Sequence, residues 1–225
     1  MARHLERWAP LGGILFVGLM IVGTLFVADV PDANTPASEI TAYLADSDNH
    51  MRNIIGAYMW VLGALALLWF LTRLRTVLRR AEGGTGTVSS LAFGAGVVFA
   101  ALWIASSAAF AAVAYAVELR DAPVSDPDLM RVLPQMAWLL LLLGGGFGGL
   151  LLLVATSIVS LSTGVLPRWL AWLGIVVAIV LPFDVIYVNI VPLLVWVLAA
   201  AIVLLMRREE TTTAPATAAP ATAPA

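Results

Sequence analysis

The chain has 225 residues, of which 61% are hydrophobic and only 12% are charged. Soluble domains carry about 25% charged residues, so this composition excludes an ordinary soluble domain. The sequence contains no cysteine, which excludes disulfides, thiolate nucleophiles and cysteine metal sites. All 12 basic residues are arginine, and this usage, with much Ala, Gly, Val and Pro, is typical of a GC-rich bacterial genome.

The first apolar run is long enough to cross a membrane, which takes about 20 residues of helix. It extends from Leu11 to Ala28 and follows Arg3 and Arg7. A secretory signal peptide also has a basic start and an apolar centre, but this run is long and V-A-D-V-P-D offers no clear cleavage site. We therefore expect a retained first helix over residues 11–30.

The polar segment after the first run predicts a short amphipathic helix in an outer loop. Thr35 and Pro36 form a helix-start signal, because a threonine hydroxyl can cap free amides and proline suits the first helical position. The apolar residues that follow share one helical face: Ala37, Ile40, Tyr43 and Leu44. We expect this face to rest on the bundle or on the lipid interface.

The second crossing is expected over residues 53–78 and the third over residues 88–117. The second ends in T-R-L-R-T-V-L-R-R, in which the spacing of Leu74, Val77 and Leu78 predicts a helix that continues into the headgroup layer. The third is rich in Ala, Gly and Ser, which let helix backbones approach closely in lipid.

The fourth crossing, over residues 132–161, is centred on G-G-G-F-G-G. Its glycines form two small-xxx-small pairs, Gly144 with Gly148 and Gly145 with Gly149. Glycine inside a helix costs about 1 kcal/mol relative to alanine in water, and tight packing on a neighbouring helix can offset that loss in a membrane. The pattern favours a close helix–helix contact; the alternative is a hinge or a broken helix beside a cavity.

The last apolar stretch, from Trp169 to Met206, is too long for one crossing and too short for two. Asp184 and Asn189 lie in its middle between two prolines. We predict a tight hairpin with a fifth helix over 168–183 and a sixth over 189–206. A re-entrant pair that does not fully cross the membrane is the alternative.

The distribution of arginine sets the orientation, because basic residues favour the cytoplasmic side of short loops. With six crossings and both ends inside, most arginines lie on the inner side, and the outer ones are Arg52, Arg120 and Arg131. Most acidic residues fall on the outer side. The sequence thus predicts an all-α, six-helix bundle in the bacterial cytoplasmic membrane, with cytoplasmic N- and C-termini.

The domain organisation follows from these runs. Residues 1–10 form a cytoplasmic N-terminus and residues 11–206 the transmembrane domain. Residues 207–225 end in a low-complexity Ala, Thr and Pro sequence and are predicted to form a disordered cytoplasmic tail.

One group of candidate ligand residues begins at Asp46, in D-S-D-N-H. It resembles the start of a calcium loop, but the sixth position is Met51 rather than glycine and the twelfth is Ala57 rather than glutamate. Asp46, Asp48 and His50 remain candidate ligands. Asp46 and His50 are four residues apart and could share a helical face, as metal ligands do. A solvated loop or a helix cap is the favoured interpretation.

Further candidates lie nearer the C-terminus. Asp126 and Asp128 could join the first group around a divalent cation. Asp184 is an acid inside an apolar stretch, and an ionisable residue at membrane depth is a functional-site hypothesis by default. The hairpin model puts it with Asn189 at the outer interface, where a capping role is favoured over a proton or ligand site.

The sequence contains no catalytic constellation. It has no HExxH and no G-x-S-x-G, and its serines have no histidine or lysine base in the membrane. Neither His4 nor His50 lies mid-membrane, so a bis-histidine haem is not expected. We expect no cofactor, no nucleic-acid partner and no enzymatic activity. The favoured function is an accessory bundle that binds lipid or another membrane protein, or that self-associates; the alternative is a small transporter or channel with an acidic outer vestibule.

Two segments carry a resemblance to a family. They read P-x-x-x-x-P-x-S-E-I-x-A-Y-L-A-D after the first helix and L-P-R-W-L-A-W-L-G before the fifth, with an arginine-ended second helix between them. This layout resembles a domain-of-unknown-function family of six-pass membrane proteins common in actinobacteria. The resemblance covers most of residues 11–206 and implies a fold but no activity, so it assigns no catalytic residue.

Overall fold

Every regular element in the described part of the chain is a helix. The computed structural model describes residues 2–27, 31, 34–122, 127–182 and 190–213. The helices, in chain order, are α1 (Ala2–Phe26), α2 (Ala37–Leu44), α3 (Ser47–Glu82), α4 (Thr87–Arg120), α5 (Pro127–Leu139), the π-helix η1 (Leu140–Gly145), α6 (Gly146–Thr163), α7 (Arg168–Val180) and α8 (Ile190–Thr213). The all-α prediction is confirmed for these residues.

Four helical stretches are long and apolar enough to cross a membrane: Trp8–Phe26, Ser47–Glu82, Thr87–Arg120 and Arg131–Thr163. They correspond to the first four predicted crossings. The last two predicted crossings correspond to shorter apolar helices, Arg168–Val180 and Ile190–Met206. The protein is therefore a helical membrane protein by the length and composition of its helices.

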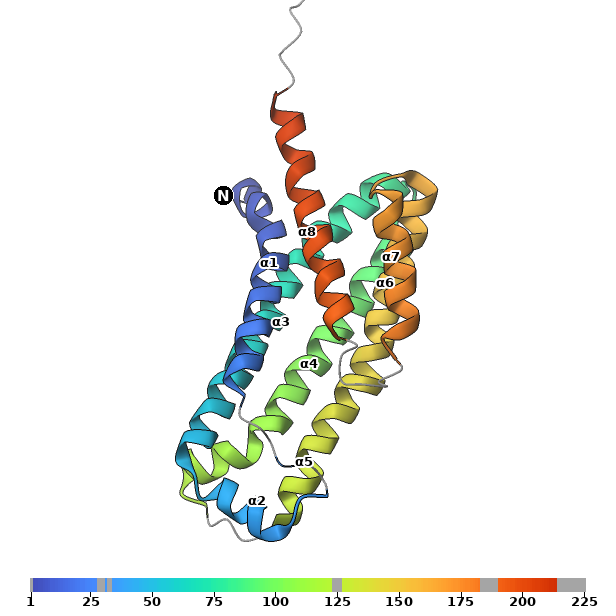
Figure 1. The fold of residues 1–225 in the computed structure, drawn as a ribbon. Coiled ribbons are helices and arrows are strands. Elements are labelled where there is room, and N and C mark those ends of the chain that lie inside the picture. Colours follow the sequence, from blue (N-terminus) through green and yellow to red (C-terminus); the bar gives the residue numbers. More distant parts are fainter. Residues whose placement is uncertain (1, 28–30, 32–33, 123–126, 183–189, 214–225) are drawn as a thin grey trace, which may run out of the picture.

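The helices form a bundle with two distinct ends (Figure 1). α1 packs on α3, α3 on α4, α4 on α6 and α6 on α7, while α8 contacts both α1 and α7. The largest buried side chains of this core are Phe16, Phe70, Phe99 and Trp196. α2 lies across one end beside α5, and the N-terminus of α1 and the C-terminal part of α8 lie at the other end.

α3 begins earlier than the predicted second crossing, at Ser47. Asp46 is its N-cap, and the Asp46 carboxylate accepts a hydrogen bond from the Asp48 amide at 3.0 Å. The cap interpretation is confirmed. The polar residues that follow therefore belong to the first turns of α3 and not to a loop.

α2 has the predicted amphipathic character. Ile40 and Leu44 are buried, and Tyr43 of α2 and Val113 of α4 pack against them. Ala37, however, is exposed. The predicted side-chain cap from Thr35 is wrong: Pro36 is the N-cap residue, and no side chain caps the helix. Because Pro36 already has the extended conformation of an N-cap, Thr35 lies one residue too early to serve.

The fourth span is an interrupted helix. Pro134 lies inside α5, and the backbone then changes to the π-helix η1 before α6 begins at Gly146. Proline removes a helical hydrogen bond, and π-turns are local defects often found at functional sites. Next to this change, the Ser106 hydroxyl of α4 donates to the Ala137 carbonyl at 2.8 Å.

The glycines of this span lie at close contacts. A Cβ at Gly148 would be 3.0 Å from the amide nitrogen of Phe99, and one at Gly144 would overlap the Leu102 side chain, both on α4. A Cβ at Gly149 would overlap the side chain of Leu181, at the end of α7. By contrast, the nearest atom to a Cβ at Gly145 is in Leu141 of the same span, at 3.3 Å.

The C-terminal part differs from the prediction in one respect. α8 continues to Thr213, so residues 207–213 are helical and not disordered as predicted. Arginine and glutamate are good helix formers, which accounts for the extension past the apolar stretch. Residues 214–225 lie outside the described part of the chain.

Candidate functional site

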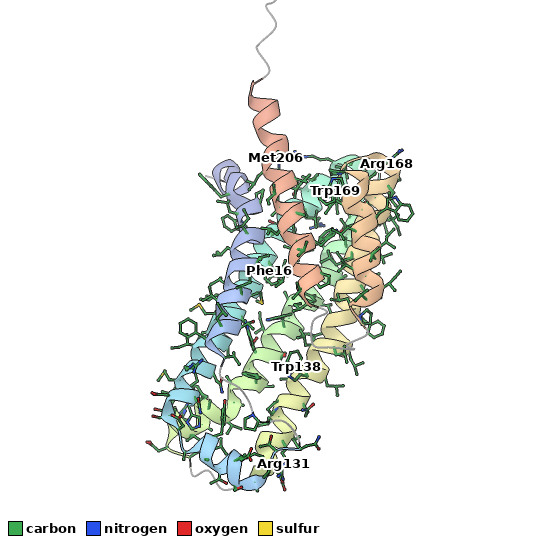
Figure 2. The ribbon with its side chains drawn as sticks, in the orientation of Figure 1. Phe16, Arg131, Trp138, Arg168, Trp169 and Met206 are labelled. Carbon is green, nitrogen blue, oxygen red and sulfur yellow. The ribbon has the colours of Figure 1, made fainter. Side chains whose placement is uncertain are left out.

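The membrane-facing surface of the bundle is apolar. Large apolar side chains are exposed on all the long helices and on α7 and α8, among them Leu25, Leu65, Val98, Ile158, Val176 and Val195. Three exposed tryptophans, Trp8, Trp169 and Trp172, lie at one end of this surface, and a fourth, Trp138, lies between the two ends (Figure 2). Figure 2 shows Trp169, Arg168 and Met206 at the same end of the bundle, with Arg131 at the opposite end. Tryptophan favours membrane–water interfaces, so this end is at or near one interface.

Polar groups gather at the two ends of the bundle. We call the first the α2 end; it comprises α2, the first turns of α3, the last turn of α4 and the first turns of α5. We call the second the arginine end; it comprises the last turns of α3, the α3–α4 turn and the start of α7. The two ends differ in chemistry and are described in turn.

At the α2 end, His50 is buried. Its side chain is 2% exposed, and its Nδ1 lies 3.5 Å from Oε2 of Glu118 on α4, which is 29% exposed. Neither ring nitrogen of His50 makes a hydrogen bond within the described residues. The sequence interpretation of His50 as a solvated loop residue is therefore wrong, because the helix that starts at Ser47 turns this side chain toward α4.

A polar contact close to His50 was missed from the sequence. The Asn53 side-chain amide of α3 donates to the Tyr43 hydroxyl of α2, and Asn53 is buried. No local motif marks this pair. The only available signal was the helical spacing of His50 and Asn53, which places them on neighbouring positions of one face of α3.

Arg131 joins two segments at the α2 end, α5 and the residues that precede α2. Its Nη1 lies 2.6 Å from Oδ1 of Asp128, and its Nη2 donates to the Thr35 carbonyl at 3.1 Å. The arginine of α5 therefore holds the segment that leads into α2. Asp128 serves as the partner of this arginine, which accounts for its carboxylate without a metal.

The predicted metal ligands are not brought together. No group of three or more His, Asp or Glu residues with metal-binding geometry occurs among the described residues. Asp46 and Asp48 are exposed at the start of α3, while His50 points into the bundle. The candidates Asp126, Asp184 and Asn189 lie outside the described residues.

The arginine end contains an open groove between α3 and α4. Its volume is about 480 Å³, and its lining residues, which we call the arginine groove, are Thr72, Arg75, Thr76, Arg79, Arg80 and Phe93. The Arg75 guanidinium lies 5.1 Å from the centre of the Phe93 ring, as in a cation–π contact. The sequence indicates these arginines as a topology signal, but no local pattern indicates Phe93, which comes from the next helix.

Glu82 closes the turn beside this groove, beyond the apolar stretch of α3. Its Oε1 and Oε2 accept hydrogen bonds from the amides of Val88 and Ser89 at 2.9 and 2.8 Å. These amides are free donors at the start of α4, so the glutamate caps that helix. The two backbone hydrogen bonds hold the pKa of Glu82 below its usual value of 4.5.

Comparison with family models, with curated proteins and with solved structures finds no match for this chain. The resemblance to a six-pass actinobacterial family stays a prediction. The function must therefore be argued from the geometry and charge of the two ends.

Proposed function

We propose that this protein is a non-enzymatic, multi-pass protein of the bacterial cytoplasmic membrane that binds an anionic molecule at its arginine end. The observation that carries this proposal is the arginine groove, in which three arginines from the last turns of α3 line one open hollow. Guanidinium groups bind carboxylates and phosphates through several parallel hydrogen bonds. Such a groove binds an anion without any chemical step.

The proposed orientation puts the arginine end in the cytoplasm. Arginine-rich short segments favour the inner side of a membrane, and α3 ends in four arginines. The N-terminus of α1 and the C-terminal part of α8 lie at this same end, so both termini are cytoplasmic in this orientation (Figure 1). The α2 end then faces the outside.

For the α7–α8 pair, a re-entrant hairpin is favoured over the two full crossings predicted from the sequence. α7 has 13 residues and is about 20 Å long, which is less than the roughly 30 Å of a hydrocarbon core. A Cβ at Gly146 would lie 3.5 Å from Cα of Pro182, and Gly146 is near the middle of the Arg131–Thr163 span. α7 therefore ends near mid-span. Both arrangements keep the termini on one side.

The test is native mass spectrometry of protein extracted in a mild detergent. We expect an anionic molecule to remain bound in stoichiometric amount, and to be lost from a variant that combines Arg75→Gln, Arg79→Gln and Arg80→Gln. The matched control combines Arg52→Gln and Arg120→Gln, two exposed arginines of the α2 end. Equal loss in both variants, or no bound anion in the wild type, contradicts the proposal.

A small transporter or channel is a second candidate function, favoured by one observation. Irregular backbone at membrane depth is tolerated where it is buried in protein or lines a water-filled cavity, and the π-helix η1 interrupts the Arg131–Thr163 span near its middle. In proteoliposomes a transporter would carry a proton or cation flux that Asp184→Asn abolishes and Asp128→Asn preserves. An absence of flux, or a flux unchanged by Asp184→Asn, contradicts this second candidate.

A further inference from the structure

The charges of the arginine groove are uncompensated by the rest of the described chain. The ion pairs among the described residues are His50 with Glu118 and Arg131 with Asp128. Neither pair involves an arginine of the groove. Glu82 is the acid nearest in sequence, and both of its carboxylate oxygens accept backbone amides of α4. None of the three guanidinium groups is therefore engaged in an ion pair within the described residues.

The polar side chains of the groove differ in whether their donors are already used. Nε of Arg75 is buried and makes no hydrogen bond within the described residues. The hydroxyls of Thr72 and Thr76 donate to the carbonyls of Trp69 and Thr72 in their own helix. The threonine hydroxyls are therefore already engaged, which leaves the guanidinium groups as the donors available to an acceptor-rich anion.

Two of the arginines are held in place by α4 and the turn. Arg75 lies over the Phe93 ring of α4. The aliphatic part of Arg79 packs so closely on Gly86 that a Cβ there would be 2.9 Å from Cγ of Arg79. A site whose charged groups are already positioned loses less conformational entropy when it binds.

An apolar surface continues from the groove toward the middle of the bundle. On α3, Leu65, Leu68 and Thr72 are spaced at helical intervals along one face, and Leu65 is exposed. On α4, Phe93 and Val97 share a face in the same way, and Val97 is exposed. Gly94 of α4 has nothing within 4 Å of the position of a Cβ, so the surface beside Phe93 is open.

We propose that the arginine groove binds the phosphate headgroup of an anionic phospholipid, whose acyl chains lie along the apolar faces of α3 and α4. This inference rests on the proposed anion binding at the arginine end and names its ligand. Basic pockets between membrane helices on the cytoplasmic side suit anionic lipid headgroups. The groove meets exposed apolar surface directly, which suits a lipid in the same leaflet better than a free phosphate ion.

The experiment uses full-length protein that has been delipidated in detergent and then titrated under native mass spectrometry. The probes are phosphatidylglycerol, phosphatidylcholine and inorganic phosphate. We expect phosphatidylglycerol to bind at least tenfold more tightly than phosphatidylcholine, and inorganic phosphate to compete weakly. The Arg75→Gln, Arg79→Gln, Arg80→Gln variant should lose this preference, and the Arg52→Gln, Arg120→Gln control should keep it.

The outcomes separate this inference from the proposed function. Equal binding of the two lipids by the wild type, or an unchanged preference in the groove variant, overturns the lipid site. Binding of inorganic phosphate as tight as that of phosphatidylglycerol overturns the lipid assignment and leaves anion binding intact. No binding of any anion overturns both. If the triple variant fails to fold, Arg79→Gln with Arg80→Gln tests the same preference, because both side chains are exposed and the Arg75–Phe93 contact is kept.

Discussion

Gly148 is a position where one residue sets the distance between two helices. A Cβ there would lie 3.0 Å from the amide nitrogen of Phe99 and 3.1 Å from the carbonyl oxygen of Ala95. Both are backbone atoms of α4, so they cannot move aside as a flexible side chain could. The close approach of α6 to α4 therefore depends on glycine at this position.

Gly148→Ala should lower the free energy of unfolding by about 1–3 kcal/mol, the usual cost of overpacking a well-packed contact. The matched control is Gly94→Ala on α4, where a Cβ meets nothing within 4 Å. It should leave stability unchanged or raise it, because alanine is the better helix former. Thermal unfolding in one detergent, followed by circular dichroism, compares them; equal effects would refute the role of Gly148.

Glu82 makes the stability of the α3–α4 turn depend on pH. Its pKa is lower in the folded protein than 4.5 because the carboxylate accepts two backbone hydrogen bonds. Its contribution is therefore complete above the unfolded value and is lost as the pH falls through the lower, folded value. In Glu82→Gln, the melting temperature should be lower at pH 7, and the difference from the wild type should shrink below pH 4.5. A difference independent of pH would contradict the cap.

His50 illustrates what the sequence alone could and could not indicate at this scale. Its position near two aspartates favoured a solvated loop or a helix cap over a metal ligand, and the cap assignment was correct for Asp46. The burial of His50 against Glu118 depends on α4, which is distant in the sequence. A local motif carries no information on such a contact.

At the scale of elements, α2 is held by few contacts. It has eight residues, too few to be stable alone in water, so its packing must stabilise it. Ile40 and Leu44 supply the apolar contact, and the guanidinium of Arg131 bonds the Thr35 carbonyl just before the helix.

Arg131→Ala should therefore speed hydrogen exchange in residues 35–45 while lowering global stability by only about 1 kcal/mol, since the side chain is partly exposed. Arg120→Ala is the control, because Arg120 lies over the Tyr115 ring of its own helix, 5.9 Å away. Hydrogen exchange read by mass spectrometry measures both variants. Protection of α2 that survives Arg131→Ala would contradict the role of this arginine.

The positions of the long helices were predictable, because each coincides with an apolar run of the length that a bilayer requires. The change to a π-helix after Leu139 was not predictable. Pro134 and the glycine run indicate that the helix is interrupted there, but they do not indicate that the interruption is a π-helix. The length of α7 was also not predictable. Its apolar pattern runs on past Val180, while the helix ends against the glycines of α6.

At the scale of the whole molecule, the sequence predicts which residues of α3 and α4 lie opposite each other in the α3–α4 hairpin. His50 and Glu118 lie equally far before and after Gly84, and so do Arg75 and Phe93. Two long antiparallel helices joined by this short turn must pair in that order. Both the buried pair at the α2 end and the cation–π contact in the groove were therefore predictable once the turn was located. The positions of α7 and α8 carry no comparable signal.

The orientation of the bundle underlies both the proposed function and the lipid site. Both proposals require the arginine groove to face the cytoplasm. The same end of the bundle carries Arg168, the start of α1 and the C-terminal part of α8 (Figure 1 and Figure 2). Because the chain has no native cysteine, a single introduced cysteine reports its own side of the membrane.

The most direct measurement is labelling of Ala45→Cys and Thr85→Cys with a membrane-impermeant maleimide. Both positions are exposed and lie at opposite ends of the bundle. In intact cells we expect Ala45→Cys to be labelled at once and Thr85→Cys only after the membrane is permeabilised. Labelling of Thr85→Cys from outside, with Ala45→Cys protected, would contradict the orientation and with it a groove on the cytoplasmic leaflet.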